Sequence, residues 1–381
     1  MSDRSIIYLD YASATPLDPQ VLAAMEPYFS REFYNPSATY GAGRAARQAL
    51  EAARAKAAHW LGARPAEVVF AAGGTEANNL AIHGVLRQFP EGNVVTAGTE
   101  HDSVLVPAGR YDCRQAAVAA DGRLDLDDLA RKIDDQTVLV SIAYANNEIG
   151  TVQALRQVAK VIAEKRAARP ELPLYFHTDA CQAANYLDLH AARLGVDLMT
   201  LDGSKIYGPK QSGILYVKAG TRLQPLMDGG HQELGLRGGT ENVAGSIGFA
   251  TALELVQETR RQEADRLTAL RDGFMDQLQK DIPSLVINGS RKYRLPNNIH
   301  VTIPGQDNER LLFGLDEAGI LAGAGSACNA SDAAPSHVLG AIGLSEAEAR
   351  ASLRFALGRQ TTPEMLDRAA RTLRDLVQGR G

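Results

Sequence analysis

Long apolar runs, cysteines and an excess of positive charge are all absent or scarce in this chain of 381 residues. No apolar run approaches the roughly 20 residues that a membrane-spanning helix needs, so we expect no membrane contact. The first residues, MSDRSIIYLDYASATP, contain no basic segment followed by an apolar one, and we therefore expect no export signal. The formal net charge of −5 gives no reason to expect binding to nucleic acid.

Only three cysteines occur, Cys113, Cys181 and Cys328, which argues against a disulfide framework. We expect a cytoplasmic setting, because thiols stay free in a reducing compartment. Cys328 lies in LAGAGSACNASDAAPS, among glycine, alanine and serine, whereas a structural cysteine normally packs among large apolar side chains. This composition predicts a mobile, solvent-reachable thiol. Cys181 is expected to be buried and to serve packing.

Strands and helices alternate over the first two thirds of the sequence. Residues 43–65 place Leu50, Ala53, Ala57 and Leu61 on one helical face, with Gly62 as the stop. Further helices are expected after Thr75, as the N-cap, and over residues 153–168. Short strands are predicted at EVVF (67–70), NVVTA (93–97), TVLVSIAYA (137–145), LYFHTDA (174–180), DLMTL (197–201) and GILYV (213–217). This alternation predicts an α/β fold with a mostly parallel sheet covered by helices.

The last third of the sequence has a different pattern. A long amphipathic helix is predicted from about Phe249 to Asp281, as a connector between domains. Hairpin-like strands follow around SLVINGS (284–290) and NNIHVTIPG (297–305), and then helices from Asn308 and Ser345. The pattern predicts a second, smaller α+β domain.

Three stretches of the first part contain residues suited to binding or catalysis. AAGGTEANN joins a strand to a helix through a Gly-Gly-Thr turn, a geometry that binds anions, although glycine turns also occur for backbone reasons alone. TEHDSVL places His101 just beyond a strand, where a structural role is favoured for the histidine taken alone. FHTDACQA places Asp179 and Gln182 at the end of a strand, where parallel sheets form ligand sites. A buried ion pair is the alternative for Asp179.

A fourth stretch, DGSKIYGPKQSGILYV, places Lys205 between two strands, whereas Lys210 follows a Gly-Pro turn and is expected to be exposed. A lysine near a buried carboxylate can form a Schiff base. Enzymes that use pyridoxal 5'-phosphate (PLP) combine such a lysine with an acidic partner for the ring nitrogen. The order of an anion-type turn, His101, Asp179 with Gln182, and Lys205 therefore predicts a PLP enzyme.

These and other motifs resemble, essentially end to end, the class I cysteine desulfurases of the NifS/IscS type, within the fold-type-I, class V aminotransferase-like family. The motifs that carry the resemblance are YLDYASATP, NPSATYGAG, GGTEANNLAI, TEHDSVL, NNEIGTVQ, HTDACQA, SKIYGPKQSGILYV, GGHQELGLRGGTENV, GSACNASDAAPSHVL and LRFALGR. The last two distinguish this subclass from ordinary aminotransferases.

The resemblance implies a domain organisation. A large PLP-binding domain would occupy residues 16–255, with a mostly parallel seven-stranded sheet between helices. A smaller α+β domain would comprise residues 1–15 and 256–381 and would carry the loop of Cys328.

The resemblance also implies roles for single residues. Those expected to be catalytic are Cys328 as nucleophile, Lys205 as the Schiff-base lysine and His101, which stacks on the cofactor. Those expected to bind the cofactor are Gly74, Thr75, His101, Asp179, Gln182, Ser204, Lys205 and Thr240. Asp179 would pair with the ring nitrogen and Gln182 with the ring hydroxyl, while Thr240 would reach the cofactor phosphate of the partner subunit in a homodimer. Asn147 and Arg354 would hold the substrate carboxylate. No metal is expected.

This chain departs from the family where it reads DGSK instead of Ser-Gly/Ala-His-Lys. Asp202 stands where a phosphate-binding serine is expected, and Ser204 where a histidine is expected. A carboxylate beside a phosphate is repulsive, so we expect Asp202 to turn away or to be bridged. Asn329, where threonine or serine is common, is expected to matter little.

The activity implied is that of a PLP-dependent L-cysteine desulfurase, a transferase that leaves alanine and a persulfide on Cys328. An acceptor protein would receive the sulfur for iron–sulfur cluster assembly or tRNA thiolation. Two alternatives stay open. One is another PLP reaction, such as selenocysteine lyase or aminotransfer. The other is a non-enzymatic scaffold for sulfur-transfer partners with a degraded cofactor site.

Overall fold

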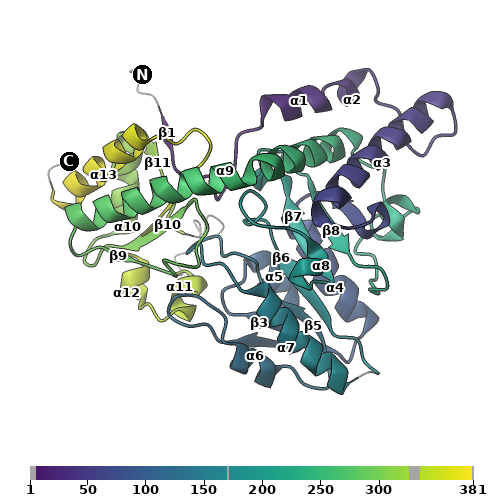
Figure 1. Cartoon of the computed structure of the whole chain (residues 1–381), viewed down its shortest axis with the longest axis horizontal. Coiled ribbons are helices and arrows are strands. Elements are labelled where there is room, and N and C mark those ends of the chain that lie inside the picture. Colours follow the sequence, from purple (N-terminus) through teal and green to yellow (C-terminus); the bar gives the residue numbers. More distant parts are fainter. Residues whose placement is uncertain (1–5, 170, 326–334, 380–381) are drawn as a thin grey trace.

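A seven-stranded sheet forms the centre of the fold, in the order β2-β8-β7-β6-β5-β3-β4 (Figure 1). This computed structural model describes residues 6–169, 171–325 and 335–379. The strands are β2 (Val68–Ala71), β3 (Asn93–Ala97), β4 (Cys113–Ala116), β5 (Thr137–Ser141), β6 (Tyr175–Asp179), β7 (Leu198–Asp202) and β8 (Gly213–Val217). β8 is antiparallel to β2 and β7, and all other neighbours are parallel. The prediction of a mostly parallel sheet is confirmed.

Helices cover both faces of this sheet. Along β2, Val68 and Phe70 belong to one buried cluster, which includes Leu50 of α3 (Gly41–Leu61) and Val158 of α7 (Leu155–Ala168). Val69 belongs to the cluster on the opposite face, with side chains of α4 (Gly74–Gln88) and α5 (Asp102–Ala108). Because successive residues of a strand point to opposite faces, the apolar strand is buried on both sides.

Helix α3 illustrates how the sequence sets an element. Leu50, Ala53, Ala57 and Leu61 are all buried along its predicted face. The helix ends at Gly62, which has a φ of 60° in the left-handed region that glycine adopts at low cost. The other short elements around the large sheet are α1 (Pro19–Met25), α2 (Pro27–Ser30), α6 (Leu126–Lys132), α8 (Ala191–Leu194) and the 3₁₀ turns η1 (Pro65–Glu67), η2 (Gly203–Lys205) and η3 (Gln232–Gly235).

A smaller layer of strands and helices lies beside the large sheet. Its antiparallel sheet has the order β12-β10-β9, and the chain start pairs in parallel with β11 as a two-stranded sheet. The strands are β1 (Ile7–Tyr8), β9 (Val286–Ile287), β10 (Asn298–Thr302), β11 (Ile320–Leu321) and β12 (Ser352–Ala356). The helices are α10 (Asn308–Glu317), α11 (His337–Ala341), α12 (Glu346–Ala349) and α13 (Pro363–Val377).

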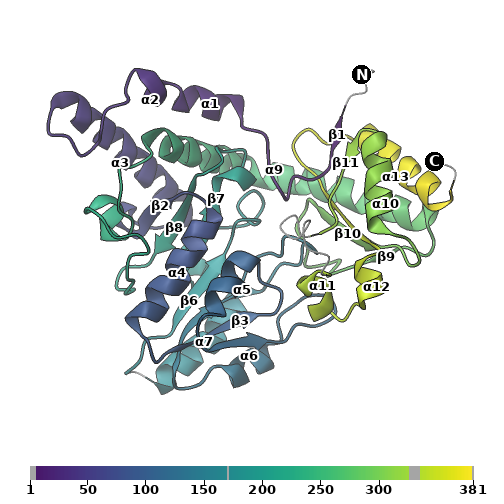
Figure 2. The same cartoon turned by 180° about the vertical axis from the view of Figure 1, so that it is seen from behind.

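One helix, α9 (Val243–Asp281), connects the two parts and runs along both of them (Figure 2). It begins six residues before the predicted start. Phe249 and Leu253 pack into the cluster under the large sheet, whereas Phe274 and Leu278 pack into the cluster of the small sheet. We propose, on this division of the buried clusters, a large domain of residues 16–255 and a small domain of residues 1–15 and 256–381.

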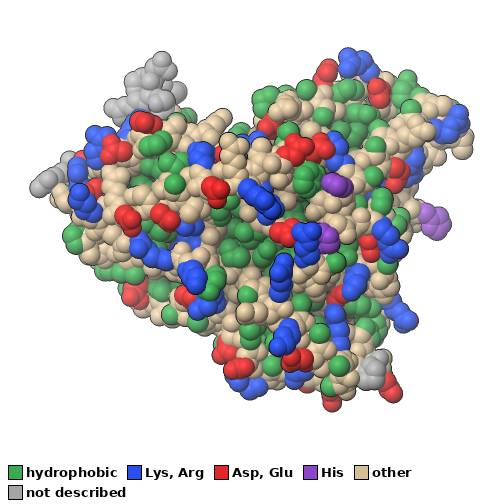
Figure 3. Space-filling model, in the orientation of Figure 1, with side chains coloured by type: hydrophobic (Ala, Val, Ile, Leu, Met, Phe, Trp, Pro, Cys, Tyr) green, Lys and Arg blue, Asp and Glu red, His purple; other side chains and the backbone are tan. Residues whose placement is uncertain are grey.

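The surface has no region of one charge sign on the face seen in Figure 3, where Lys and Arg side chains are interspersed with Asp and Glu. Within the described ranges, no helix combines the length and apolar character that crossing a membrane requires.

Candidate active site

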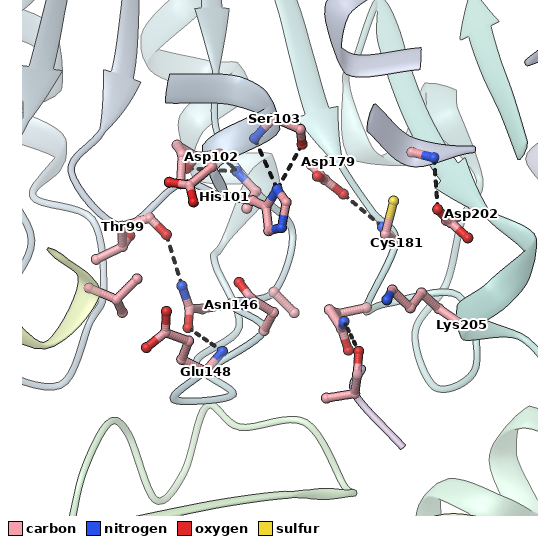
Figure 4. Close-up of a pocket in the computed structure, with 18 of the residues that line it drawn as sticks. Thr99, His101, Asp102, Ser103, Asn146, Glu148, Asp179, Cys181, Asp202 and Lys205 are labelled. Atoms are coloured by element: carbon pink, nitrogen blue, oxygen red, sulfur yellow. Dashed lines mark hydrogen bonds between the residues drawn. The ribbon is translucent and has the colours of Figure 1, made fainter. Parts of the chain in front are cut away.

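A cavity of about 270 Å³ lies where the carboxyl ends of the central parallel strands meet the small layer. This volume is near the lower end of the range for ligand pockets, about 300 to 1,000 Å³. The cavity is lined by residues at or just after the ends of β3, β6 and β7 (Figure 4). The start of α4 and Arg354 of β12 also line it. The location is typical of ligand sites in open α/β sheets.

Most of the predicted site residues meet at this cavity, although they come from distant parts of the chain. Those that line it are Gly74, Thr75, His101, Asn147, Asp179, Gln182, Lys205 and Arg354. Ser204 and Thr240 are not among its lining residues; Thr240 is exposed on a separate segment. Cys328 lies outside the described residues.

Asp179, at the end of β6, is held by neutral donors. Its Oδ2 accepts a hydrogen bond of 2.7 Å from the side-chain amide of Asn78, and its Oδ1 accepts one of 2.9 Å from the backbone amide of Cys181. These bonds orient the carboxylate without neutralising it, so it can pair with a cationic group in the cavity. Asp179 therefore does not form the buried ion pair that was the alternative for it.

Cys181 is buried, as predicted, and lies against the glycine turn. A Cβ on Gly74 would come within 2.8 Å of the Cys181 Sγ, so glycine is required there. Burial, followed by the charges of Asp179 and Asp202, raises the pKa of the Cys181 thiol well above its usual value. A thiol in this state is not a nucleophile at neutral pH.

Lys205 occupies the 3₁₀ turn η2 and projects its amine into the cavity (Figure 4). Its Nζ donates a hydrogen bond to the backbone carbonyl of Ser13. Lys210, by contrast, is exposed, as predicted. Of these two lysines, only Lys205 is placed to react with a ligand in the cavity.

His101 is the N-cap of α5, and its ring is oriented by the first turn of that helix. Its Nδ1 accepts a hydrogen bond of 3.0 Å from the backbone amide of Ser103 and lies 2.8 Å from the Ser103 hydroxyl. Because Nδ1 accepts from the amide, the neutral ring carries its proton on Nε2. The ring borders the cavity, where it can contact a flat ligand.

Arg354 is the cationic side chain on the β12 side of the cavity and is only 2% exposed. Its Nη2 donates to Asp10 at 2.7 Å and to the Ser13 hydroxyl at 2.8 Å, while Nη1 donates to the backbone carbonyl of Asn147 at 3.1 Å. Its Nε is buried and has no hydrogen-bond partner in the described part of the chain. Because Arg354 lines the cavity, its guanidinium charge is placed to attract a ligand carboxylate.

The turn before α4 corrects one prediction. The N-cap is Gly73, with a φ of 129°, and not Thr75, which lies inside the first turn. Gly73 has no side chain to cap the helix, and the carboxylate of Asp202 does so from the end of β7. Its Oδ2 accepts a hydrogen bond of 2.8 Å from the backbone amide of Gly74. The anion-binding property expected of this turn is thus present, with a side chain of the protein as the anion.

Several cavity residues were not singled out from the sequence. Asn78 stands four residues after Gly74, so it shares the inward face of α4, and this helical spacing is the signal that was available. Glu100 is fully buried, and the single backbone N–H of Ala143 is shared between its two carboxylate oxygens, at 3.0 and 2.9 Å. Burial raises its pKa well above the usual value. His337 of α11 lies 2.9 Å from the Glu100 carbonyl through Nε2.

Comparison with known proteins places this chain among enzymes of one family. Residues 7–368 match the model of the aminotransferase class-V family. A cysteine desulfurase IscS of Dictyoglomus turgidum is 40% identical over 379 residues, covering 98% of this chain and 94% of that protein. A solved structure named NifS-like protein aligns with a TM-score of 0.91 at 29% identity, covering 98% of this chain and 100% of the other.

A third relative is a structure entitled SspA in complex with cysteine. It is 35% identical and aligns with a TM-score of 0.79, covering 92% of this chain and 98% of the other. With the cavity geometry and the full-length matches together, the chain belongs to the aminotransferase class-V family, among its cysteine desulfurases of the NifS/IscS type.

Proposed function

We propose that this protein is an L-cysteine desulfurase that depends on PLP. It would convert L-cysteine and the thiol of Cys328 into L-alanine and a persulfide on Cys328, so that the sulfur atom moves to the protein and all atoms balance. The observation that carries the proposal is the convergence of Lys205, Asp179 and His101 with Arg354 at one cavity.

The donor set of the cavity fits PLP. An amine, an oriented carboxylate and an imidazole border it, and an anion site lies at the start of α4, where the carboxylate of Asp202 stands in for a phosphate. Lys205 would hold the cofactor covalently, Asp179 would keep a proton on the ring nitrogen, and Gln182 would contact the ring hydroxyl. When bound, PLP draws electrons from the α-carbon of an amino acid.

The residues of the chain would supply the remaining steps. Arg354 and Asn147, which both line the cavity, would fix the substrate carboxylate. The Lys205 amine would remove the proton from the α-carbon. The Cys328 thiolate would attack the sulfur of the substrate, breaking the carbon–sulfur bond. His101, with its proton on Nε2, is placed to deliver or accept a proton at the cavity.

The test is product formation by the purified protein from L-cysteine. Under reductant, alanine and sulfide should appear in equal amounts, and without reductant a persulfide should be found on the peptide that contains Cys328. Alanine without sulfide, or sulfide with pyruvate instead of alanine, would contradict the proposal. A scaffold role is the second candidate, and the one observation in its favour is the occupied anion site at Asp202. A protein that takes up no cofactor at all would support that role.

The proposal also covers the oligomeric state, the compartment, the sulfur acceptor and the substrate. We infer a homodimer, because the exposed Thr240 does not line the cavity of its own subunit among the described residues and is expected to reach that of a partner. The cysteines Cys113 and Cys181 are free thiols, which is compatible with the reducing cytoplasm. The sulfur would pass to an acceptor protein for iron–sulfur cluster assembly or tRNA thiolation. L-cysteine is the proposed substrate, and selenocysteine is the alternative.

A further inference from the structure

The anion site at the start of α4 is already satisfied by a side chain of the protein. Besides the bond from the Gly74 amide, Asp202 accepts two more through its Oδ1. These come from the backbone amide of Ser204 at 2.7 Å and from the Ser204 hydroxyl at 2.6 Å. The carboxylate thus bridges the glycine turn and η2, and it lies beside the cavity that the cofactor would enter (Figure 4).

These three donors include groups that a cofactor phosphate is expected to use. Of the expected cofactor-binding residues, Gly74 and Ser204 donate to Asp202, whereas Thr240, expected to reach the phosphate of the partner subunit's cofactor, does not line the cavity. Thr75 lines the cavity without being engaged by Asp202. A phosphate that approaches the turn must therefore displace the carboxylate or bind beside it.

The charges around the turn make binding beside it unfavourable. All three hydrogen bonds to Asp202 come from neutral donors, so none of them compensates the charge of a carboxylate. Arg237 also reaches the first turn of α4, but it pairs with Glu76, its Nε 2.8 Å from the Glu76 Oε1. Two like charges at hydrogen-bond range repel strongly in a partly buried site.

We propose that Asp202 is a built-in competitor for the cofactor phosphate. Its carboxylate has to release the Gly74 amide and the Ser204 hydroxyl before the phosphate can take them, so the phosphate contributes less to cofactor affinity than the turn alone would allow. The inference deepens the proposed function and depends on it, because it concerns the same cofactor. Its signature is a low ratio of affinity for PLP over pyridoxal, which lacks the phosphate.

Equilibrium dialysis of the full-length protein, freed of cofactor, measures this ratio directly. Asp202→Ser removes the charge and keeps a short polar side chain, and Asp202→Asn removes the charge at nearly constant shape. Both should bind PLP about tenfold more tightly than the unmodified protein, because the like charge at the helix N-terminus is gone and a neutral side chain holds the Gly74 and Ser204 donors less strongly. Binding of pyridoxal should stay within about twofold, since it makes no contact with the turn.

Glu76→Gln is the matched control. It removes one negative charge near the same helix start, at a carboxylate that pairs with Arg237 and accepts from the Ala72 amide, not from the Gly74 amide. The change in PLP affinity should therefore be well below that of the Asp202 variants.

Three outcomes would overturn the inference. The first is weaker or unchanged PLP binding by both Asp202 variants with unchanged thermal stability. The second is an equal gain in affinity for PLP and for pyridoxal, which would show that the effect does not depend on the phosphate. The third is an equal gain in PLP affinity for Glu76→Gln, which would show that any loss of negative charge has the same effect. Failure of every variant to bind either ligand is distinguishable from these, because it overturns the proposed function itself.

Discussion

Arg354 and Asp10, which are 344 positions apart in the chain, form an ion pair with 2.7 Å between Nη2 and Oδ1 at the edge of the cavity. Together with the bonds to Ser13 and to the Asn147 carbonyl, the pair fixes the orientation of the guanidinium. The first strand of the small layer leads directly into Asp10, so the chain start contributes to the orientation of the proposed substrate-binding group.

Arg354→Lys should impair cysteine binding more than it impairs cofactor binding. Lysine keeps the charge but has no planar fork, and it cannot bind Asp10 and a substrate carboxylate in the same geometry. We expect KM for L-cysteine to rise by about 30-fold, which corresponds to the loss of one charge-assisted hydrogen bond of about 2 kcal/mol. Steady-state kinetics and PLP titration together measure the two effects.

Arg359→Lys is the control for this variant, because it makes the same change in the same LRFALGR motif. Arg359 pairs with Asp18 at 2.8 Å and does not line the cavity. Its KM should stay close to that of the unmodified protein. An equal rise of KM in both variants would show that the effect comes from the fold and not from the substrate contact.

Lys205→Ala should abolish covalent attachment of PLP, because Lys205 presents its amine to the cavity. Borohydride reduction of the loaded protein, followed by peptide mapping, should label the peptide of Lys205 in the unmodified protein and nothing in the variant. Lys210→Ala, at an exposed position, should be labelled normally. Loss of label in Lys210→Ala with label retained in Lys205→Ala would mean that the assignment is wrong.

Cys328→Ser tests the nucleophile, which lies outside the described residues. The variant should bind PLP and L-cysteine as before, because the cavity residues are untouched. It should release essentially no sulfide, since a serine hydroxyl is a far poorer nucleophile towards sulfur than a thiolate. Sulfide release is measured from L-cysteine under reductant, beside selenide release from selenocysteine.

The two products separate the alternatives for this protein. Loss of sulfide release alone would identify a selenocysteine lyase activity in addition, since selenium can leave without a protein thiol. Wild-type rates with both substrates in Cys328→Ser would contradict the desulfurase assignment.

The protein should be an obligate homodimer at micromolar concentration. The exposed side chains near Thr240 and on α1 and α2 include Leu22, Phe29 and Leu234, and large apolar side chains of this kind favour an interface. Analytical ultracentrifugation of the PLP-loaded protein measures the mass. A monomer that still binds PLP tightly would show that Thr240 has no role across an interface.

The stability of the fold should fall as the pH drops below about 6.5, in part because of His177. This side chain is buried between the hydroxyls of Ser141 and Thr200, and burial lowers its pKa to about 4. The unfolded chain takes up this proton near the ordinary value of about 6.5, so between these pH values the unfolded state binds more protons. The free energy of unfolding should therefore decrease by up to about 1.4 kcal/mol per pH unit from this one group.

Burial also lowers the pKa of His300, to about 3, and this group adds a pH dependence of stability with the same sign. Glu100 opposes both, because its raised pKa stabilises the fold at low pH and loses that effect as the pH rises. Urea unfolding of the unmodified protein and of His177→Gln at pH 7 and pH 5.5 isolates the histidine contribution. The two proteins should differ in slope, and equal slopes would contradict a neutral buried His177.

The sequence predicts the large sheet well because its inner strands are apolar on both faces. The edge strand β4 was missed, since in CRQA only Ala116 is buried and the apolar signal is absent. The start of α9 was placed late because Gly245 and Gly248, which are common helix breakers, lie in its first turns.

In the cavity, Lys205, Asp179 and Arg354 could be named from motifs, because each motif is short and specific. The position of Asp202 could not. Its contact with Gly74 spans 128 positions, and the charge of an aspartate does not reveal which backbone amide its side chain will reach. Contacts of this kind depend on how strand ends and helix starts meet in three dimensions.

The unbroken course of α9 limits how the cavity can open and close. At about 1.5 Å per residue its 39 residues span about 58 Å, and residues 249–272 contain neither glycine nor proline, the usual points at which helices bend. Both hydrophobic clusters include side chains of this one helix. A hinge motion between the two parts would therefore require the helix itself to bend or break. We expect Asp179 and Arg354 to keep a nearly constant separation during turnover, with larger displacements confined to the connecting loops.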